Sequence, residues 1–163
     1  MRTTFPQPSI QRGETVEKRV VIRGIQRGQI FWADIPAEHV VGSEQFHEDG
    51  PTPFVVVSRQ LINKSLHAVQ GVPLSRLKDK NVTGEFRKFR VRIPADEVTF
   101  FDVGTDEKPL EQVDMLALTE QARVLGHGRL LWGPAGKVSV EGLHSIEAGL
   151  RYVFDIPDPS VPA

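Results

Sequence analysis

Short β-strand patterns separated by turn residues run through most of this 163-residue sequence and restrict its fold more than any other feature. PFVVVSR (53–59) is a continuous β-branched run, as expected for a strand buried on both faces. Further strands are predicted in RGQIFWADIP (27–36), HAVQGVPLS (67–75), VDMLALTE (113–120) and, from Phe89 onward, FRKFRVRIP (86–94). The sequence therefore predicts a small, mostly antiparallel β-barrel or curled sheet.

One strong helical pattern follows the strands. Ser139 is a good N-cap candidate, and apolar residues recur after it at helical spacing: Leu143, Ile146, Leu150 and Val153. LINKS (61–65) predicts only a short helical turn. The glycines at 126, 128, 133 and 136 are turn signals, so we expect turns before the helix. The expected fold class is mainly β with helices, ending in a C-terminal helix packed on the sheet.

The length of the chain fits a single domain. Residues 1–19 are polar, contain two prolines and show no periodicity, so we expect residues 1–26 to form a flexible N-terminal extension. The domain itself is expected over residues 27–156, and the proline-rich residues 157–163 form a C-terminal tail.

Several classes of protein are excluded by what the sequence lacks. It contains no cysteine, which excludes disulfides, thiolate zinc sites, iron–sulfur clusters and cysteine nucleophiles. No apolar stretch suits a secretory signal or a membrane span, so we expect a cytoplasmic protein without a membrane partner. The five histidines lack metal-ligand spacing, and the common phosphate-loop, hydrolase and dinucleotide motifs are missing. We therefore expect neither a metal nor a cofactor.

The net charge of −1 hides two neighbouring segments of opposite charge. Residues 76–92 carry seven basic and two acidic side chains, whereas residues 94–114 carry seven acidic side chains and one lysine. Phe86 and Phe89 alternate with the basic residues, a pattern that suits phosphate contact and base stacking on single-stranded nucleic acid. The alternative is a pair of solvated faces that neutralise each other. In both cases we expect the acidic stretch to lie beside the basic one.

Three polar clusters border the predicted strands. VGSEQ (41–45) lies in the long connection before the second strand and suits a lid or a solvated loop. GVPLS (71–75) ends in a hydroxyl next to Arg76, which suits a phosphate contact or a simple turn. ALTEQARVL (117–125) places Glu120, Gln121 and Arg123 after a buried strand, which favours a strand-end charge network or a subunit contact.

Taken in order, these segments resemble the MazF/PemK family of toxin endoribonucleases, the mRNA interferases of type II toxin–antitoxin systems. RGQIFWADIP, VGSEQ, PFVVVSR, GVPLS, LTEQARVLGHGRL and the terminal helix carry the resemblance, from Arg27 to about Phe154. It implies an SH3-like β-barrel of the MazF/PemK/CcdB type that forms a homodimer. It also implies binding of single-stranded RNA and inhibition by a cognate antitoxin with an acidic, disordered tail.

The resemblance implies RNA cleavage without a metal, in which the ribose 2′-hydroxyl attacks the adjacent phosphate. Ser75 matches the family's hydroxyl at the end of the third strand, but Thr52 stands where the family's catalytic arginine is expected. His47, Arg76 and Arg59 are the alternatives for proton or charge work. Glu44 and Gln45 are expected to order the lid. The remaining residues expected to bind RNA are basic: Lys78, Lys80, Arg87 and Lys88.

Two other functions remain open at this stage. Because the expected arginine is replaced, the protein could bind RNA or a protein partner with little or no cleavage. Gyrase poisoning of the CcdB kind is the other. The C-terminal sequence IPDPSVPA and the positions of Trp32 and Trp132 argue against it.

Overall fold

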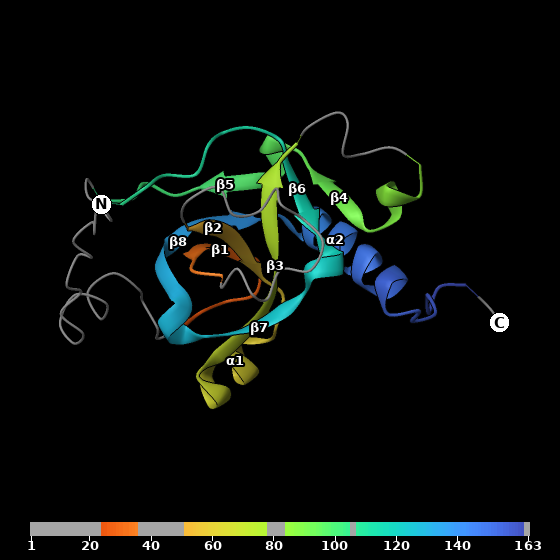
Figure 1. Ribbon diagram of the computed structural model, residues 1–163, viewed down its shortest axis with the longest axis horizontal. Coiled ribbons are helices and arrows are strands. Elements are labelled where there is room, and N and C mark those ends of the chain that lie inside the picture. Colours follow the sequence, from red (N-terminus) through yellow and green to blue (C-terminus); the bar gives the residue numbers. More distant parts are fainter. Residues whose placement is uncertain (1–23, 36–50, 78–83, 105–106, 162–163) are drawn as a thin grey trace, which may run out of the picture.

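The computed structural model describes residues 24–35, 51–77, 84–104 and 107–161 (Figure 1). Its strands are β1 (Gln29–Ala33), β2 (Thr52–Val56), β3 (Ala68–Arg76), β4 (Arg90–Ile93), β5 (Val98–Phe100), β6 (Met115–Leu118), β7 (Arg123–Gly126) and β8 (Leu130–Val138). The α-helices are α1 (Gln60–Leu66) and α2 (Val140–Val153). Short 3₁₀ helices are η3 (Gly84–Lys88), η4 (Ala95–Glu97), η5 (Thr119–Gln121) and η6 (His127–Arg129).

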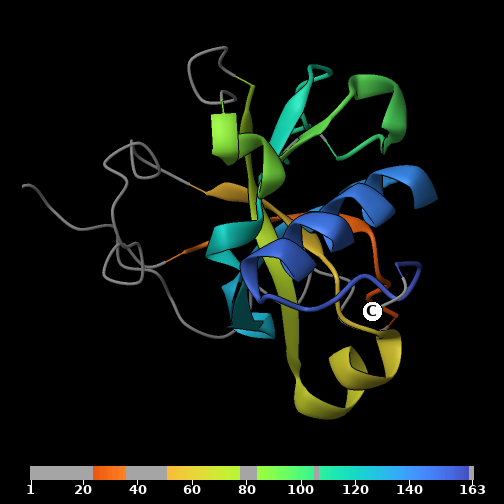
Figure 2. The same ribbon diagram turned by 90° about the vertical axis from the view of Figure 1, so that its right-hand side faces the viewer.

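The strands form one antiparallel sheet in the order β4-β6-β3-β2-β1-β8-β5, with β7 paired to β3. The first half of β3 pairs with β7 and its second half with β6, so β3 joins the two parts of the sheet. The sheet curls, and α2 lies against it (Figures 1 and 2). Ser139 caps α2 as predicted, because its hydroxyl oxygen accepts a hydrogen bond of 2.9 Å from the Gly142 amide. The predicted curled sheet with a C-terminal helix is confirmed.

The central strands are buried on both faces, as the β-branched run predicts. On one face Ile30, Trp32 and Val55 pack with Leu74 and with Ile146 of α2. On the other face the alternate residues form a second cluster: Ile25, Phe31, Ala33, Ile35, Phe54, Val56, Val69, Leu125 and Leu130. Because Ile25 belongs to this cluster, the packed domain includes at least two residues before Arg27. Two core layers around one sheet hold the end of β3 in place.

The connection from β2 to β3 is fixed by a buried polar network. Asn63 in α1 is 1% exposed, and its amide donates to the carbonyl oxygens of Ile25 at 3.2 Å and Ser58 at 3.3 Å. The Ser58 hydroxyl donates to the Asn63 side-chain oxygen and accepts a bond of 2.9 Å from the Gln70 amide. These bonds satisfy the buried polar groups and tie α1 to the start of β3.

The glycine-rich region from 126 to 136 is where the sequence-based prediction was wrong. Gly126 ends β7 and Gly128 lies in the single turn of η6, but Gly133 and Gly136 lie within β8, which pairs with β1 and β5. A Cβ atom added at Gly133 would lie 2.6 Å from the Phe31 ring, and one at Gly136 would lie 2.9 Å from Leu110. These glycines are therefore required by close packing against neighbouring elements. The sequence also missed β5 and β7, whereas the strand predicted from Phe89 onward is present as β4.

Candidate functional site

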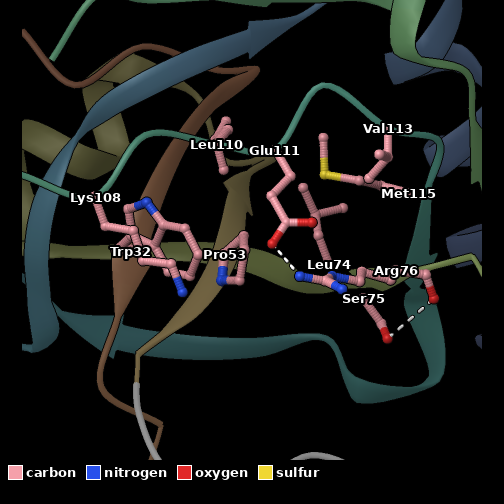
Figure 3. Close-up of a pocket in the computed structure, with 10 residues that line it drawn as sticks. All are labelled: Trp32, Pro53, Leu74, Ser75, Arg76, Lys108, Leu110, Glu111, Val113 and Met115. Atoms are coloured by element: carbon pink, nitrogen blue, oxygen red, sulfur yellow. Dashed lines mark hydrogen bonds and ion pairs between the residues drawn. The ribbon is translucent and has the colours of Figure 1, made fainter.

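A cavity of about 200 Å³ lies where β3 ends and β6 begins (Figure 3). Its apolar lining comes from β1, β2, β3, β6 and the segment before β6: Trp32, Pro53, Leu74, Leu110, Val113 and Met115. Its polar lining is Ser75, Arg76, Lys108 and Glu111. Trp32 and Pro53 form the floor of the cavity, because the pairing of β1 with β2 places them opposite each other on one face. The cavity thus combines a largely apolar surface with four polar residues, a composition typical of ligand sites.

Arg76 is held by an ion pair with Glu111 across the cavity (Figure 3). The side chains are 68% and 44% exposed, respectively. Ion pairs between exposed groups contribute only about 0–1 kcal/mol to stability. An incoming phosphate can therefore compete with the Glu111 carboxylate for the guanidinium at small cost.

A second cation, Lys108, lies over the aromatic floor of the cavity. The Lys108 ammonium is 4.6 Å from the centre of the Trp32 ring, and Trp32 itself is 5% exposed. Its indole Nε1 is buried and makes no hydrogen bond. Lys108 and Arg76 give the polar lining two positive charges against the single carboxylate of Glu111. This arrangement suits a flat apolar group that carries a phosphate.

Ser75 lies next to Arg76, but the two side chains leave β3 in different directions. The Ser75 hydroxyl is 3.4 Å from the Arg76 carbonyl oxygen, to which it donates, and it points away from Glu111 in Figure 3. Consecutive residues of a strand point to opposite faces, which explains this divergence. Ser75 therefore contributes to the wall of the cavity beside the strand end.

Residues 26–154 match the family described as "PemK-like, MazF-like toxin of type II toxin-antitoxin system". This chain belongs to that family. Among curated proteins, none matches the sequence significantly.

Solved structures of an endoribonuclease and of MazF proteins share the fold at low sequence identity. An endoribonuclease in complex with its cognate antitoxin from a mycobacterial species is 20% identical, with TM-score 0.51, covering 83% of this chain and 99% of that one. MazF from Deinococcus radiodurans is 18% identical, with TM-score 0.53, covering 80% and 96%. A MazE–MazF complex from the same organism is 15% identical, with TM-score 0.55, covering 82% and 97%. The resemblance identified from the sequence is thus confirmed for family and fold.

Two of the predicted site residues lie away from the cavity in this MazF-like fold. Thr52 is buried at the start of β2 and shares its face with Phe54 and Val56, opposite to the face of Pro53. Arg59 precedes α1 beside the start of β3, where Ser58 bonds to Gln70. Gln70 and Arg76 are six residues apart on β3, which separates Arg59 from Arg76 by about 20 Å along the strand.

Arg87 and Lys88 lie in η3, before the start of β4. Lys88 pairs with Glu85 at 2.8 Å, and its ammonium is 5.3 Å from the centre of the Tyr152 ring. Hydrogen bonds from Lys88 and then from Tyr152 lower the pKa of the Glu85 carboxyl. The hydrogen bond to Glu85 in turn raises the pKa of Lys88. The remaining predicted residues lie outside the described part of the chain: Glu44, Gln45, His47, Lys78 and Lys80.

The acidic stretch does lie beside the basic one, as predicted. Glu111 pairs with Arg76, and Asp114 pairs with Arg92 at 2.5 Å. Asp102 and Glu107, in contrast, line a second hollow with Phe100 and Phe101. The acidic residues that neutralise the basic segment are therefore Glu111 and Asp114, which lie just before β6. A charge pair of the kind predicted for a strand end lies at the other end of β6, where Arg90 pairs with Glu120 at 2.8 Å.

The sequence missed Trp32, Lys108 and Glu111 as cavity residues. The one available signal was Lys108, the single basic residue in an otherwise acidic segment. Within the described ranges, no three histidine, aspartate or glutamate side chains gather to hold a metal ion. No helix in that part of the chain is long and apolar enough to cross a membrane.

Asp114 predicts a pH dependence of stability. A hydrogen bond from the Ala95 amide at 3.0 Å, and then Arg92, lower the pKa of its carboxyl in the folded state. Its stabilising effect is therefore complete above the unfolded pKa of about 3.9 and is lost as pH falls through the lowered value. In urea unfolding, wild type should exceed Asp114→Asn in stability at neutral pH and converge with it in strong acid. A gap that is equal at both ends of the pH range would contradict this assignment.

Proposed function

We propose that this chain is a toxin endoribonuclease that cleaves single-stranded mRNA at specific sequences, by attack of the ribose 2′-hydroxyl and without a metal. The observation that carries the proposal is the cavity at the end of β3, where Arg76 and Lys108 flank an apolar floor beside Ser75. Family membership supports the same reading, since the solved relatives include an endoribonuclease bound to its cognate antitoxin. The expected cellular location is the cytoplasm, where mRNA is found.

In this proposal each group of the cavity has a task. A base lies on the apolar floor near Trp32, and the scissile phosphate lies between Arg76 and Lys108. The Arg76 guanidinium stabilises the charge of the phosphorane, the role that the family gives to an arginine in place of Thr52. Ser75 is proposed to contact the phosphate from the edge of the cavity, once its hydroxyl releases the Arg76 carbonyl oxygen. His47 is the proposed group for proton transfer, and Glu44 and Gln45 order the lid.

The decisive experiment is incubation of the purified protein with mixed-sequence RNA in EDTA. We expect fragments that end in a cyclic phosphate on one side and a 5′-hydroxyl on the other, which analysis of the fragment ends by mass spectrometry would identify. Intact RNA at a large excess of protein would overturn the proposal. Fragments that carry 5′-phosphate ends would overturn the proposed mechanism while leaving RNA cleavage in place.

A second function, RNA binding without cleavage, is favoured by one observation. Arg76 is already paired with Glu111, and Thr52 cannot supply the missing charge. This alternative predicts salt-dependent binding whose slope reports the number of contacted phosphates, with no fragments formed. The EDTA experiment, run together with a binding titration, separates the two functions.

The partners proposed for this chain follow from the family. We propose a homodimer, and an antitoxin whose acidic tail competes with RNA for Arg76 and Lys108. Sedimentation of the full chain would test the dimer. An acidic peptide that fails to inhibit cleavage at low salt would count against the antitoxin contact.

Neutralising Glu111 is expected to strengthen RNA binding. Glu111→Gln frees Arg76 for a phosphate, which should raise affinity about three- to tenfold near 50 mM salt and steepen the salt dependence by about one phosphate contact. Fluorescence anisotropy with a labelled single-stranded RNA would measure both effects. Asp102→Asn removes the same charge from the second hollow and serves as the matched control, with a smaller effect. Equal effects of the two variants would show that only net charge matters.

A further inference from the structure

Three aromatic rings from two distant parts of the chain meet at the side of the molecule formed by η3 and α2. The Phe86 and Phe89 rings are 5.5 Å apart between centroids, and the Phe89 and Tyr152 rings are stacked at 6.1 Å with an interplanar angle of 10°. Tyr152 comes from the last turn of α2, and η3 lies beside that end of the helix (Figure 1). We call Phe86, Phe89 and Tyr152 the aromatic platform.

The outer rings of the aromatic platform remain open to solvent. Phe86 is 48% exposed and Tyr152 is 47% exposed, although aromatic side chains of this size contribute most to stability when buried. Packing between η3 and α2 alone therefore does not account for them. Each ring also carries a cation, because Arg90 lies 4.9 Å from the centre of Phe86 and Lys88 lies 5.3 Å from that of Tyr152.

The aromatic platform lies at the opposite end of β4 and β6 from the cavity. Met115 lines the cavity and pairs with Ile93, whereas Leu118 pairs with Arg90, three residues further along β6. Three residues of a strand span about 10 Å, so β4 and β6 bridge a short distance between the two places. A single strand of RNA that leaves the cavity can reach the aromatic platform along these strands.

We propose that the aromatic platform is a second RNA contact, at which unpaired bases of the bound strand stack on Phe86 and Tyr152 outside the cleavage cavity. This inference rests on the proposed function. Rings interleaved with lysine and arginine match the alternation of base and phosphate along one strand, and stacking of this kind tolerates any base sequence. Lys88 and Arg90, which pair with Glu85 and Glu120 in the free protein, contact the neighbouring phosphates of the bound strand. The chemistry favours nucleic acid over a peptide for this reason.

The test compares long and short RNA that cannot be cleaved. Full-length protein is titrated with 2′-O-methyl single strands of about 12 and about 4 nucleotides, the longer one covering a typical single-strand site. Tyr152→Ala and Phe86→Ala should each weaken binding of the long strand about tenfold and leave the short strand unaffected. Tyr152→Phe keeps the ring, loses only the 3.2 Å hydrogen bond to Glu85, and should bind both strands like wild type.

Two other results of this titration overturn the inference. An equal loss for both lengths, together with a lowered melting temperature, would mean that the rings only hold η3 against α2. Unchanged RNA binding with altered self-association in Tyr152→Ala would mark a contact between copies of the chain.

The proposed function is tested separately from the aromatic platform. If RNA is not cleaved but long-strand binding still depends on Tyr152, the cleavage proposal fails alone. If cleavage occurs and Tyr152→Ala binds normally, the aromatic platform fails alone.

Discussion

Replacing Arg76 with alanine is expected to lower the rate of RNA cleavage at least about 100-fold, the usual effect of removing one group that stabilises transition-state charge. The guanidinium stands at the cavity between Ser75 and Glu111 and takes the place of the family's arginine in the proposed mechanism. Its side chain is 68% exposed, so the variant should fold normally. Arg76→Lys should recover only part of the rate, because an ammonium cannot form two parallel bonds to a phosphate. Single-turnover cleavage of a labelled RNA measures the effect.

Arg59→Ala is the matched control for Arg76→Ala. It removes the same type of exposed side chain just before α1, beside the start of β3 and about 20 Å from Arg76 by strand length. We expect its cleavage rate to stay within about threefold of wild type, since a distant exposed charge acts mainly through screened electrostatics. Full activity in Arg76→Ala would remove the arginine from the mechanism. His47 would then be the residue to test next.

The central strands could be predicted because their pattern matches their burial. The β-branched run in PFVVVSR has no polar face, and the two core clusters cover both faces of β2, so composition and environment agree. The helix after Ser139 was equally clear, since a cap and a regular apolar face point to the same element. β8 was missed for a physical reason. Gly133 and Gly136 are typical of turns, yet here they allow Phe31 and Leu110 to pack against the strand.

The cavity could be predicted only on its β3 side. Ser75 and Arg76 are neighbours in the sequence, so a strand end with a hydroxyl and a cation was visible. Lys108 and Glu111 reach the same place through a long-range contact of an irregular segment, which no local pattern encodes. Thr52 occupies the arginine's place in the family pattern, whereas strand alternation puts Pro53, not Thr52, on the cavity side. The alternation along β2 can be read from the sequence, but which of its faces meets the cavity depends on the pairing of Pro53 with Trp32, which only the structure shows.

Introducing a methyl group at Gly71 is expected to destabilise the whole domain. Gly71 lies in the middle of β3 opposite Val56. A Cβ atom there would lie 2.5 Å and 2.9 Å from two atoms of the Phe54 ring, and closer still to the Val55 carbonyl oxygen. Phe54 is fully buried and the carbonyl belongs to the backbone of β2, so neither can move away cheaply. Gly71→Ala should therefore cost about 3 kcal/mol.

A cost of this size corresponds to a fall of roughly 6–12 °C in melting temperature for a domain of this length. Gly126→Ala in β7 is the matched control, because a Cβ there has no neighbour within 4 Å. Its backbone is already extended, with φ −64° and ψ 150°, so the change should stay within about 0.5 kcal/mol. Urea and thermal unfolding of both variants would measure the difference.

Because β3 also carries Ser75 and Arg76, Gly71→Ala should lose cleavage activity along with stability, whereas Arg76→Ala should lose activity alone. Equal melting temperatures for Gly71→Ala and Gly126→Ala would show that β2 can shift away from β3 at this point.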